Sequence, residues 1–320
     1  MSAERPTLLD LFLQKDADPV VGLIDEAARL VPEVSGQTAA RGQLVTIPNV
    51  GAARTIKGRT FKTCVRVALP DAPFRNENEG VDATKSRYER RTVETFTMNP
   101  RWECDIAIAR SHEDGPEAFI ASEAQAILTS AIMGLGRQFY YGRSASADTK
   151  GHPGLVDVIQ TAYTVDATGS TADTASSVWA VKWGPQAVQW IFGQNGDLQV
   201  EPARLESIAD ADGKRFTAYV QELLAFCGLQ VARVDCLGRI KNLTAQAGKT
   251  LEDDMLADLL SKFPVGMRPD CLFMSRRSLT QLQKSRTATN ATGAPAPFPT
   301  EYEGVPIVPT DSLLDTEAIG

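Results

Sequence analysis

The sequence predicts an α+β fold that joins a strand-rich arm, one long helix and a mixed body of strands and helices. Three observations support this. Residues 41–105 alternate short apolar runs with charged residues. From Asp114 to about Tyr141, apolar side chains recur at steps of three or four, as on one face of a helix. After residue 150, strand-like and helix-like stretches follow one another along the chain.

The arm over residues 41–105 carries the clearest functional signal. It holds 12 Lys/Arg against 8 Asp/Glu, a balance of +4, whereas the whole chain has −7 and the other 255 residues therefore hold −11. An isolated hairpin is marginal in water and needs a neighbouring surface. We therefore expect the basic arm to reach onto an acidic neighbouring subunit. The predicted subunit-interface residues are Arg54, Lys57, Arg59, Lys62, Arg66, Arg87, Arg90 and Arg91.

The elements around the arm follow in order. Residues 7–31 contain one amphipathic helix that Pro32 ends, with Val20, Leu23, Ile24, Ala27 and Leu30 at helical spacing. The arm turns either at Asn49–Gly51 or between Pro70 and Gly80, and a strand at 92–98 returns from it. The long helix has a capping-box-like start at Ser111 and ends at Gly142.

The body begins with a strand at Val178–Trp183, in which Trp179 and Trp183 face the core, and a short helix from Gly184 to Phe192. Two strands are predicted at 216–224 and 228–234, on either side of Cys227 and Gly228. A helix at 251–263, a strand at 271–274, a helix capped by Ser275 and running to Arg286, and a strand at 305–308 complete the chain.

Composition narrows the class of protein. A hydrophobic content of 43% with 23% charged residues is ordinary for a globular chain. The net charge of −7 argues against bulk nucleic-acid binding as the main task. No run approaches the ~18 apolar residues of a membrane helix, and the apolar cluster near Leu8 is too short for a signal peptide. The five cysteines are scattered, which favours buried thiols in a reducing compartment over disulfides or zinc.

The sequence contains only weak candidates for a catalytic site. His112 precedes Glu113 and Asp114, and a cytosolic α/β enzyme with its site near His112 is the alternative from a different class. Acidic residues at a helix start, which suit the helix dipole, explain this cluster more simply. His152 is expected in a solvated turn, and neither H-E-x-x-H nor a phosphate-binding glycine loop occurs. We predict no enzyme activity and no catalytic, cofactor or metal site.

Several of these stretches together resemble a known family. Pro6–Leu11 is similar to the start of an N-terminal arm, and residues 41–105 to an extended loop. The helix ending Phe139-Tyr140-Tyr141-Gly142, with Gly151–Leu155 after it, is similar to a spine helix and its following loop. Val178–Phe192 and Tyr302–Asp311 also resemble this family, which is that of the tailed-bacteriophage major capsid proteins with the Hong Kong 97-type fold.

The resemblance implies an N-terminal arm (1–45), an extended β loop (46–110), a peripheral spine helix (111–150), an axial α/β domain (151–300) and a C-terminal strand (301–320). It implies pentamers and hexamers of an icosahedral head shell around double-stranded DNA, which the shell contacts only non-specifically. The expected partners are other copies of the chain, a separate scaffolding protein, a portal and a decoration protein, with no membrane. The expected place is the virion, after assembly in the host bacterial cytoplasm. An encapsulin-like compartment is the alternative within this architecture.

Overall fold

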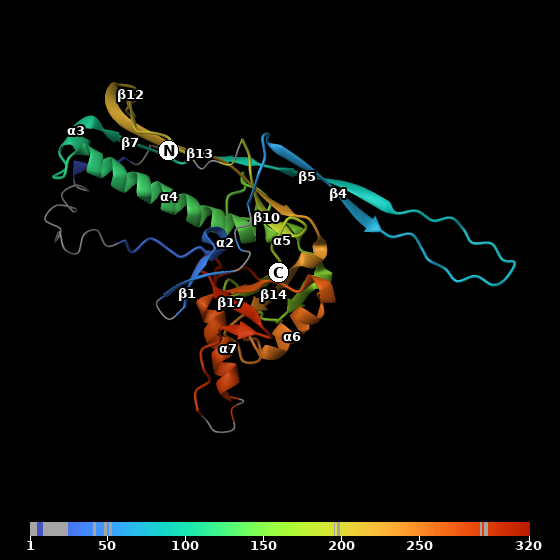
Figure 1. The fold of residues 1–320 in the computed structure, drawn as a ribbon. Coiled ribbons are helices and arrows are strands. Elements are labelled where there is room, and N and C mark those ends of the chain that lie inside the picture. The colour runs from blue at the N-terminus through green and yellow to red at the C-terminus, as the bar shows by residue number, and fades with distance from the viewer. Residues whose placement is uncertain are drawn as a thin grey trace.

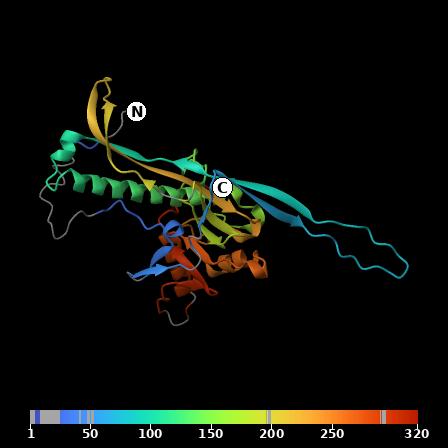
Figure 2. The ribbon, with the colours of Figure 1, turned by 45° about the horizontal axis from the view of Figure 1, so that its top comes forward.

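The computed structural model describes residues 5–8, 25–40, 43–47, 50, 53–194, 196, 199–288, 290 and 294–320. The body is elongated, and one thin hairpin projects far beyond it (Figure 1). A turned view shows the long helix α4 running beside the extended strands of one sheet (Figure 2). Two larger sheets and this helix therefore form the frame that carries the hairpin.

Helix α4 (Pro116–Tyr141) confirms the predicted long helix. It starts at Pro116 behind Gly115, so the predicted capping box at Ser111 is wrong. The Ser111 hydroxyl instead donates to the carbonyl of Ala107, in the preceding helix α3 (Ile106–Arg110). Gly142 ends α4 with a φ of 53°, and a Cβ there would lie 2.2 Å from the Gly154 nitrogen. Close backbone approach therefore explains this glycine.

The first large sheet is centred on one strand of 17 residues, β13. Beneath its outer part, Trp102, Cys104, Ala109 and Phe119 form a small core that holds the start of α4. The strands of this first sheet are β3 (Ala53–Thr55), β6 (Phe96–Met98), β7 (Arg101–Asp105), β10 (Val188–Phe192), β11 (Gln199–Val200), β12 (Arg204–Ala209) and β13 (Arg215–Val231).

The second sheet has six strands and both of its faces are covered. Along β9, Val178 and Ala180 face helices α6 (Asp253–Ser261) and α7 (Arg276–Ala288), whereas Trp179 and Val181 face the end of α4. The predicted core position of Trp179 and Trp183 is confirmed. In spatial order the strands are β16 (Glu301–Tyr302), β17 (Val305–Pro309), β15 (Cys271–Met274), β9 (Ser176–Val181), β14 (Leu237–Leu243) and β8 (Thr164–Asp166).

Short elements complete the chain. The strand at 271–274, the helices at 251–263 and 275–286 and the strand at 305–308 are confirmed to within a few residues. The remaining short elements are α2 (Pro32–Ser35), β1 (Gln37–Ala40), β2 (Gln43–Thr46), α5 (Leu155–Val158), η1 (Thr161–Tyr163), η2 (Val234–Cys236) and η3 (Val265–Met267).

The predicted helix from Gly184 to Phe192 is wrong. Gly184 has a φ of 137° and opens a tight turn, after which Val188–Phe192 forms strand β10. This strand pairs antiparallel with β13 and parallel with β3. Its β-branched and aromatic residues fit a strand buried in a sheet, and this tertiary pairing outweighs the helix-start signal of Gly184-Pro185.

The two strands predicted at 216–224 and 228–234 are one continuous strand, β13. The sequence suggested a break because Gly228 weakens a strand interior. In the structure Gly228 allows two backbones to pack closely, since a Cβ there would lie 2.6 Å from the carbonyl oxygen of Glu94. The return strand of the hairpin therefore crosses β13 at a point where only glycine fits.

This crossing yields a prediction on stability. Gly228→Ala is expected to lower the free energy of unfolding by about 1–3 kcal/mol, because the Glu94 backbone must move. Gly134→Ala is the matched control: it has no neighbour within 4 Å and lies inside α4, so it should raise stability by up to about 1 kcal/mol. Chemical denaturation measures both, and equal effects of the two variants would contradict the assignment.

The N-terminal prediction is only partly testable. Val20, Leu23 and Ile24 lie outside the described residues, whereas 25–31 are described and are not helical. Pro32 does not end a helix but occupies the first turn of α2. The side chain of Glu33, on α2, is completely buried against the body.

The expectation that no segment could cross a membrane needs correction. An 18-residue window within α4 has a mean hydropathy of 1.4, which suffices by length and composition alone. A core helix passes the same test, and both ends of α4 do supply buried residues, namely Phe119, Leu135, Phe139 and Tyr140. Only 17% of that window is buried, and the other large apolar side chains, such as Ile127 and Ile132, are half-buried within one chain.

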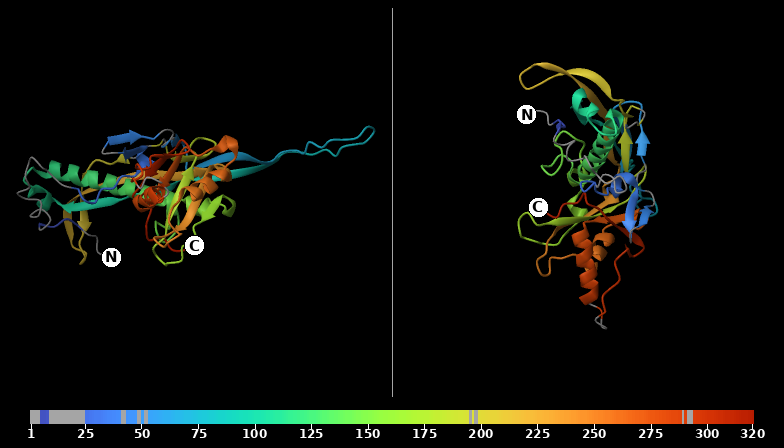
Figure 3. Two further views of the ribbon diagram at one scale, coloured as in Figure 1. Left: turned by 90° about the horizontal axis from the view of Figure 1, so that it is seen from below. Right: turned by 90° about the vertical axis from the view of Figure 1, so that its left-hand side faces the viewer.

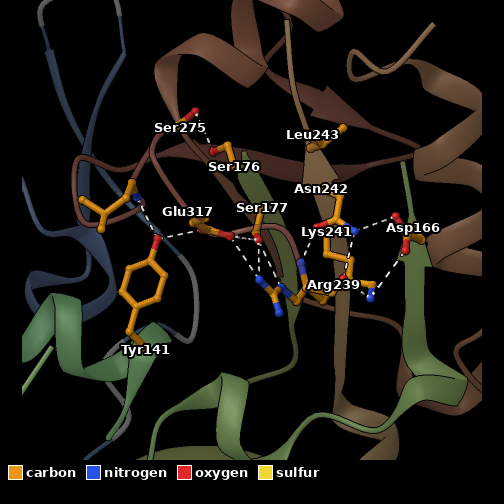
Figure 4. A network of polar contacts seen from close by, with 12 residues as sticks. Tyr141, Asp166, Ser176, Ser177, Arg239, Lys241, Asn242, Leu243, Ser275 and Glu317 are labelled. Atoms are coloured by element: carbon orange, nitrogen blue, oxygen red, sulfur yellow. Dashed lines mark hydrogen bonds and ion pairs between the residues drawn. The ribbon is translucent and has the colours of Figure 1, made fainter. Parts of the chain in front are cut away.

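A buried polar network holds the C-terminal segment against the second sheet (Figure 4). Glu317 accepts hydrogen bonds from Tyr141 at 2.7 Å, from Ser177 at 2.5 Å and from Arg239 at 3.0 Å. The Tyr141 hydroxyl in turn accepts from the Leu314 backbone at 2.8 Å. The end of α4, strand β9 and strand β14 therefore all converge on one carboxylate.

Candidate assembly surface

The hairpin consists of β4 (Thr60–Ala68), β5 (Arg87–Glu94) and the connecting residues 69–86. Of the two predicted turns, the structure selects the second, with a turn at Asn76–Glu79. Pro70 and Pro73 cannot donate to a strand ladder, which explains why pairing stops at Ala68. Seen from below, the hairpin leaves the body as a single thin extension (Figure 3, left).

The two faces of the hairpin differ. Phe61, Thr63 and Val65 lie on one face and are half-buried, whereas Lys62, Cys64 and Arg66 on the other face are exposed. Cross-strand pairing places Arg90 opposite Cys64, so Lys62, Arg66 and Arg90 share the exposed face. We call these three residues the basic face. Cys64 is exposed here, so the prediction of buried cysteines is wrong at this position and confirmed at the other four.

The remaining predicted interface residues lie elsewhere. Arg54 is on β3 with its guanidinium 4.2 Å from the Phe61 ring, and Arg59 donates to Thr97 at 3.0 Å. Arg91 donates to the Ala232 carbonyl at 2.9 Å. These three side chains therefore also hold the hairpin to its own body. Lys57 is exposed in the loop after β3, and Arg87 is exposed on the side of β5 opposite the basic face.

The far end of the hairpin, residues 70–82, was missed as a functional element; we call it the tip. It carries Asp71, Glu77, Glu79 and Asp82 against one Arg75, a balance of −3. Phe74 within it is fully exposed, and Leu69 beside it is 70% exposed. The acidic residues of the tip are visible in the sequence. Because charge was counted over the whole arm, their negative charge was averaged with the positive charge of the residues in β4 and β5, which we call the basic stalk.

A groove of about 930 Å³ separates the hairpin from the body. Residues 63–69 of the β4 edge form one wall, and the segment around Arg233 forms another. Two of its cations have ion-pair partners, since Arg233 pairs with Asp235 and Arg91 with Glu89, whereas the Arg66 guanidinium lies 5.4 Å from the Tyr88 ring. Two of the three cations that line the groove are therefore paired within one chain, and Arg66 belongs to the basic face.

The structure gives no support to an enzyme site at His112. Its ring lies 5.6 Å from that of Phe119, and its Nδ1 atom accepts a hydrogen bond from the Asp114 backbone at 3.2 Å. These contacts stabilise the turn before α4. Among the described residues no group of three or more His, Cys, Asp and Glu side chains could hold a metal ion.

His152 departs from its prediction. It was expected in a solvated turn, but it is only 2% exposed, with its ring against Trp190 at 5.6 Å. Burial lowers its pKa, so the imidazole is neutral at neutral pH. Nearby, Gln138 donates to the backbone carbonyls of Gly142 and His152. The chain after α4 is therefore folded back onto the helix end, where sequence gave only a turn pattern.

Comparisons with known proteins agree with this architecture. The family model for major capsid protein GP7 matches residues 51–319. A structure of bacteriophage epsilon15 is similar at a TM-score of 0.74 and 19% identity, covering 99% of this chain and 98% of that chain. No curated protein matches.

More distant likenesses include the bacteriophage JBD30 capsid, at a TM-score of 0.46 and 9% identity over 82% of this chain and 89% of that chain. An encapsulin complex from Synechococcus elongatus is similar at a TM-score of 0.43 and 10% identity, covering 70% of this chain and 98% of that chain. The decisive match is that of the family model, which spans most of the chain. The predicted Hong Kong 97-type fold of a tailed-bacteriophage major capsid protein is thereby confirmed, and the chain belongs to the major capsid protein GP7 family.

Proposed function

We propose that copies of this chain assemble as pentamers and hexamers of an icosahedral head shell that encloses double-stranded DNA, and that the hairpin makes the contact between subunits. One observation carries the second part: β4 and β5 extend beyond the body as a two-stranded sheet with an exposed basic face. Such a sheet is not stable alone, so a neighbouring surface completes it.

We propose that different segments of the chain have different roles in the shell. Residues 1–45 form an arm that clasps a neighbour, 46–110 the extended loop, 111–150 the spine helix, 151–300 the axial domain at the capsomer centre and 301–320 the closing strand. Head-to-tail contacts between identical copies close into rings, which is the geometry that capsomers require. Of the eight arginines and lysines predicted for this interface, Lys62, Arg66 and Arg90 contact the neighbour directly in this proposal, and Arg54, Arg59 and Arg91 hold the hairpin in place.

The shell also needs other components. We infer a separate scaffolding protein, a portal and a decoration protein as partners, with assembly in the cytoplasm of a host bacterium. Contact with packaged DNA is non-specific, in keeping with the net charge of −7. The chain performs no catalysis in this role, and an enzyme-loaded encapsulin compartment is distinguished by purifying shells and asking whether they contain DNA or enzyme.

The basic face provides the direct test. The triple variant Lys62→Glu/Arg66→Glu/Arg90→Glu is expected to abolish shells while the monomer stays folded, because the three side chains are exposed and reverse six units of charge. Negative-stain electron microscopy and light scattering detect the shells, and circular dichroism checks the fold. The charge-keeping control Lys62→Arg/Arg66→Lys/Arg90→Lys should assemble. Normal shells from the reversed triple would refute the hairpin interface.

A further inference from the structure

We propose that α2 is a latch that Glu33 controls: α2 lies closed on α4 and on residues 310–312 while this carboxyl is protonated, and it detaches when the carboxyl ionises. The detachment concerns a single chain and goes beyond the proposed function. Only its meaning for the arm at 1–45, which contains α2, rests on that function.

Glu33 is enclosed from three sides. Thr310 donates to its Oε2 atom at 3.0 Å, and the hydroxyl of Ser312 lies beside its carboxyl. On α4, a Cβ at Gly136 would lie 2.7 Å from Oε1 of Glu33 and 2.5 Å from Cγ1 of Val31. Figure 1 shows α2 against this part of α4. Only glycine therefore fits beneath the closed α2.

The site accommodates a neutral carboxyl but not a charged one. Among the described residues no Lys or Arg pairs with Glu33, and its buried Oε1 atom has no hydrogen-bond partner. The titratable groups that face it are Tyr140 on α4, Cys271 at the start of β15 and Asp311 in the C-terminal segment. Burial raises the pKa of Tyr140 and of Cys271, so both are neutral at neutral pH, and Asp311 repels a negative charge on Glu33. A charge on Glu33 is therefore buried without a compensating cation, which is costly.

α2 is the element that can yield without unfolding the rest. It has four residues, residues 25–29 before it are exposed, and Gly36 behind it has a φ of 69°. Its attachments include the buried Val31 and Pro32 and a hydrogen bond from Trp190 Nε1 to the Glu33 carbonyl oxygen at 2.9 Å. Short segments with few buried contacts open at a lower cost in free energy than the whole domain. Detachment therefore brings the carboxylate into water while α4 and both large sheets stay folded.

Proton linkage gives the direction of the switch. The pKa of Glu33 is about 7 when α2 is closed, and the solvated carboxyl regains its ordinary value of 4.5 on opening. The closed form is therefore favoured below about pH 4.5, and this advantage is lost as pH rises through about 7. Over this range opening becomes more favourable by a factor on the order of a hundred.

Hydrogen exchange of the unassembled chain, followed by mass spectrometry, tests the latch. The unmodified chain and Glu33→Gln are compared at each pH between about pH 5 and pH 8, so that the intrinsic pH dependence of exchange cancels. The exchange rates of residues 31–38 should differ by only a few-fold at the acidic end. At about pH 8 the unmodified chain should exchange on the order of a hundredfold faster. Low urea should leave this exchange unchanged, because a local opening exposes little surface.

The strand Cys271–Met274 serves as the reporter of global unfolding. Exchange of residues 31–38 at the rate and with the urea dependence of that strand would overturn the latch, because Glu33 would then act only on the whole fold. The outcome does not depend on assembly. Absence of shells would therefore overturn the proposed function and leave the latch untouched.

Two further variants test the latch without replacing Glu33. Gly136→Ala changes no titratable group but places a methyl group against Val31 and Glu33, so residues 31–38 should exchange rapidly at every pH, including about pH 5. Gly134→Ala, also on α4 but with no neighbour within 4 Å, is the matched control. Asp311→Asn, at an exposed position, removes a repelling charge and should slow this exchange severalfold at about pH 8. Equal protection in the two glycine variants, or faster exchange in Asp311→Asn, would contradict the assignment.

Discussion

Replacing Glu317 with alanine is expected to lower the free energy of unfolding by about 3–5 kcal/mol, the cost of leaving a buried charge without its partner. Arg239 has a side chain that is 17% exposed, and it pairs with Glu317, which is 5% exposed. The substitution also removes the acceptor of Tyr141 and Ser177. Denaturant unfolding of the unassembled chain measures the change.

Two variants show whether the loss comes from burial or from charge. Arg239→Met/Glu317→Leu removes both charges and should be closer to the unchanged chain than either single substitution, because no unpaired charge remains. Asp212→Ala breaks an ion pair whose side chains are 79% and 80% exposed, and should leave the melting temperature unchanged. A Glu317→Ala effect as small as that of Asp212→Ala would mean that the network does not anchor the C-terminal segment.

The second large effect is a dependence of stability on pH that Glu33 causes. Burial raises its pKa to about 7 from 4.5, and this outweighs the hydrogen bonds from Ser312 and Thr310 that favour the carboxylate. Thr310 donates to Oε2 at 3.0 Å, while Oε1 is buried without a partner among the described residues. The nearby charge of Asp311 raises the pKa further, and the buried Tyr140 hydroxyl and Cys271 thiol are also close to Glu33.

Proton linkage determines whether Glu33 stabilises the fold at low or at high pH. Between about pH 4.5 and pH 7 the folded chain keeps a proton on Glu33 that the unfolded chain has lost. The corresponding stability is fully present below pH 4.5 and is lost as pH rises through about 7. At about pH 8 the loss is on the order of 3 kcal/mol. Glu33→Gln, which keeps the neutral shape at every pH, should therefore be more stable than the unchanged chain at high pH.

Calorimetry of both proteins between about pH 5 and pH 8 measures this difference. The two melting temperatures should lie close together at the acidic end and diverge as pH rises, with Glu33→Gln the higher. Glu103→Gln serves as a control for a carboxylate that pairs with Arg5 near the surface. Parallel curves for Glu33→Gln and the unchanged chain would show that Glu33 does not titrate in this range.

Sequence patterns predicted those parts of the fold whose local signal and tertiary position agree. The apolar stripe of α4 with Gly142 behind it, the buried run at Cys271–Met274 and the Ser275 cap all lie where expected. Prediction was wrong where a long-range contact overrides a local signal. Gly184 looked like a helix start and became a turn into β10, and Gly228 looked like a strand break and became a crossing point.

The interface residues divide in the same way. Charge alone identified the basic stalk, and strand alternation then separates Lys62, Arg66 and Arg90 from the residues that bind their own body. The buried ionisable groups were not predicted. Glu33 meets Thr310 across 277 positions and Glu317 meets Tyr141 across 176, separations over which a single sequence carries no pairing signal.

Local periodicity and composition predict the α+β class, the long helix and the extended arm with its charge, because these features depend on residues close together in the chain. The capsid family was predicted from the resemblance of several segments to that family. The three-dimensional structure was needed to show which residues of the arm share its exposed face and that the carboxylates of Glu33 and Glu317 are buried. Those properties arise when segments far apart in sequence enclose a side chain or leave it exposed, and burial is a property of the packed chain.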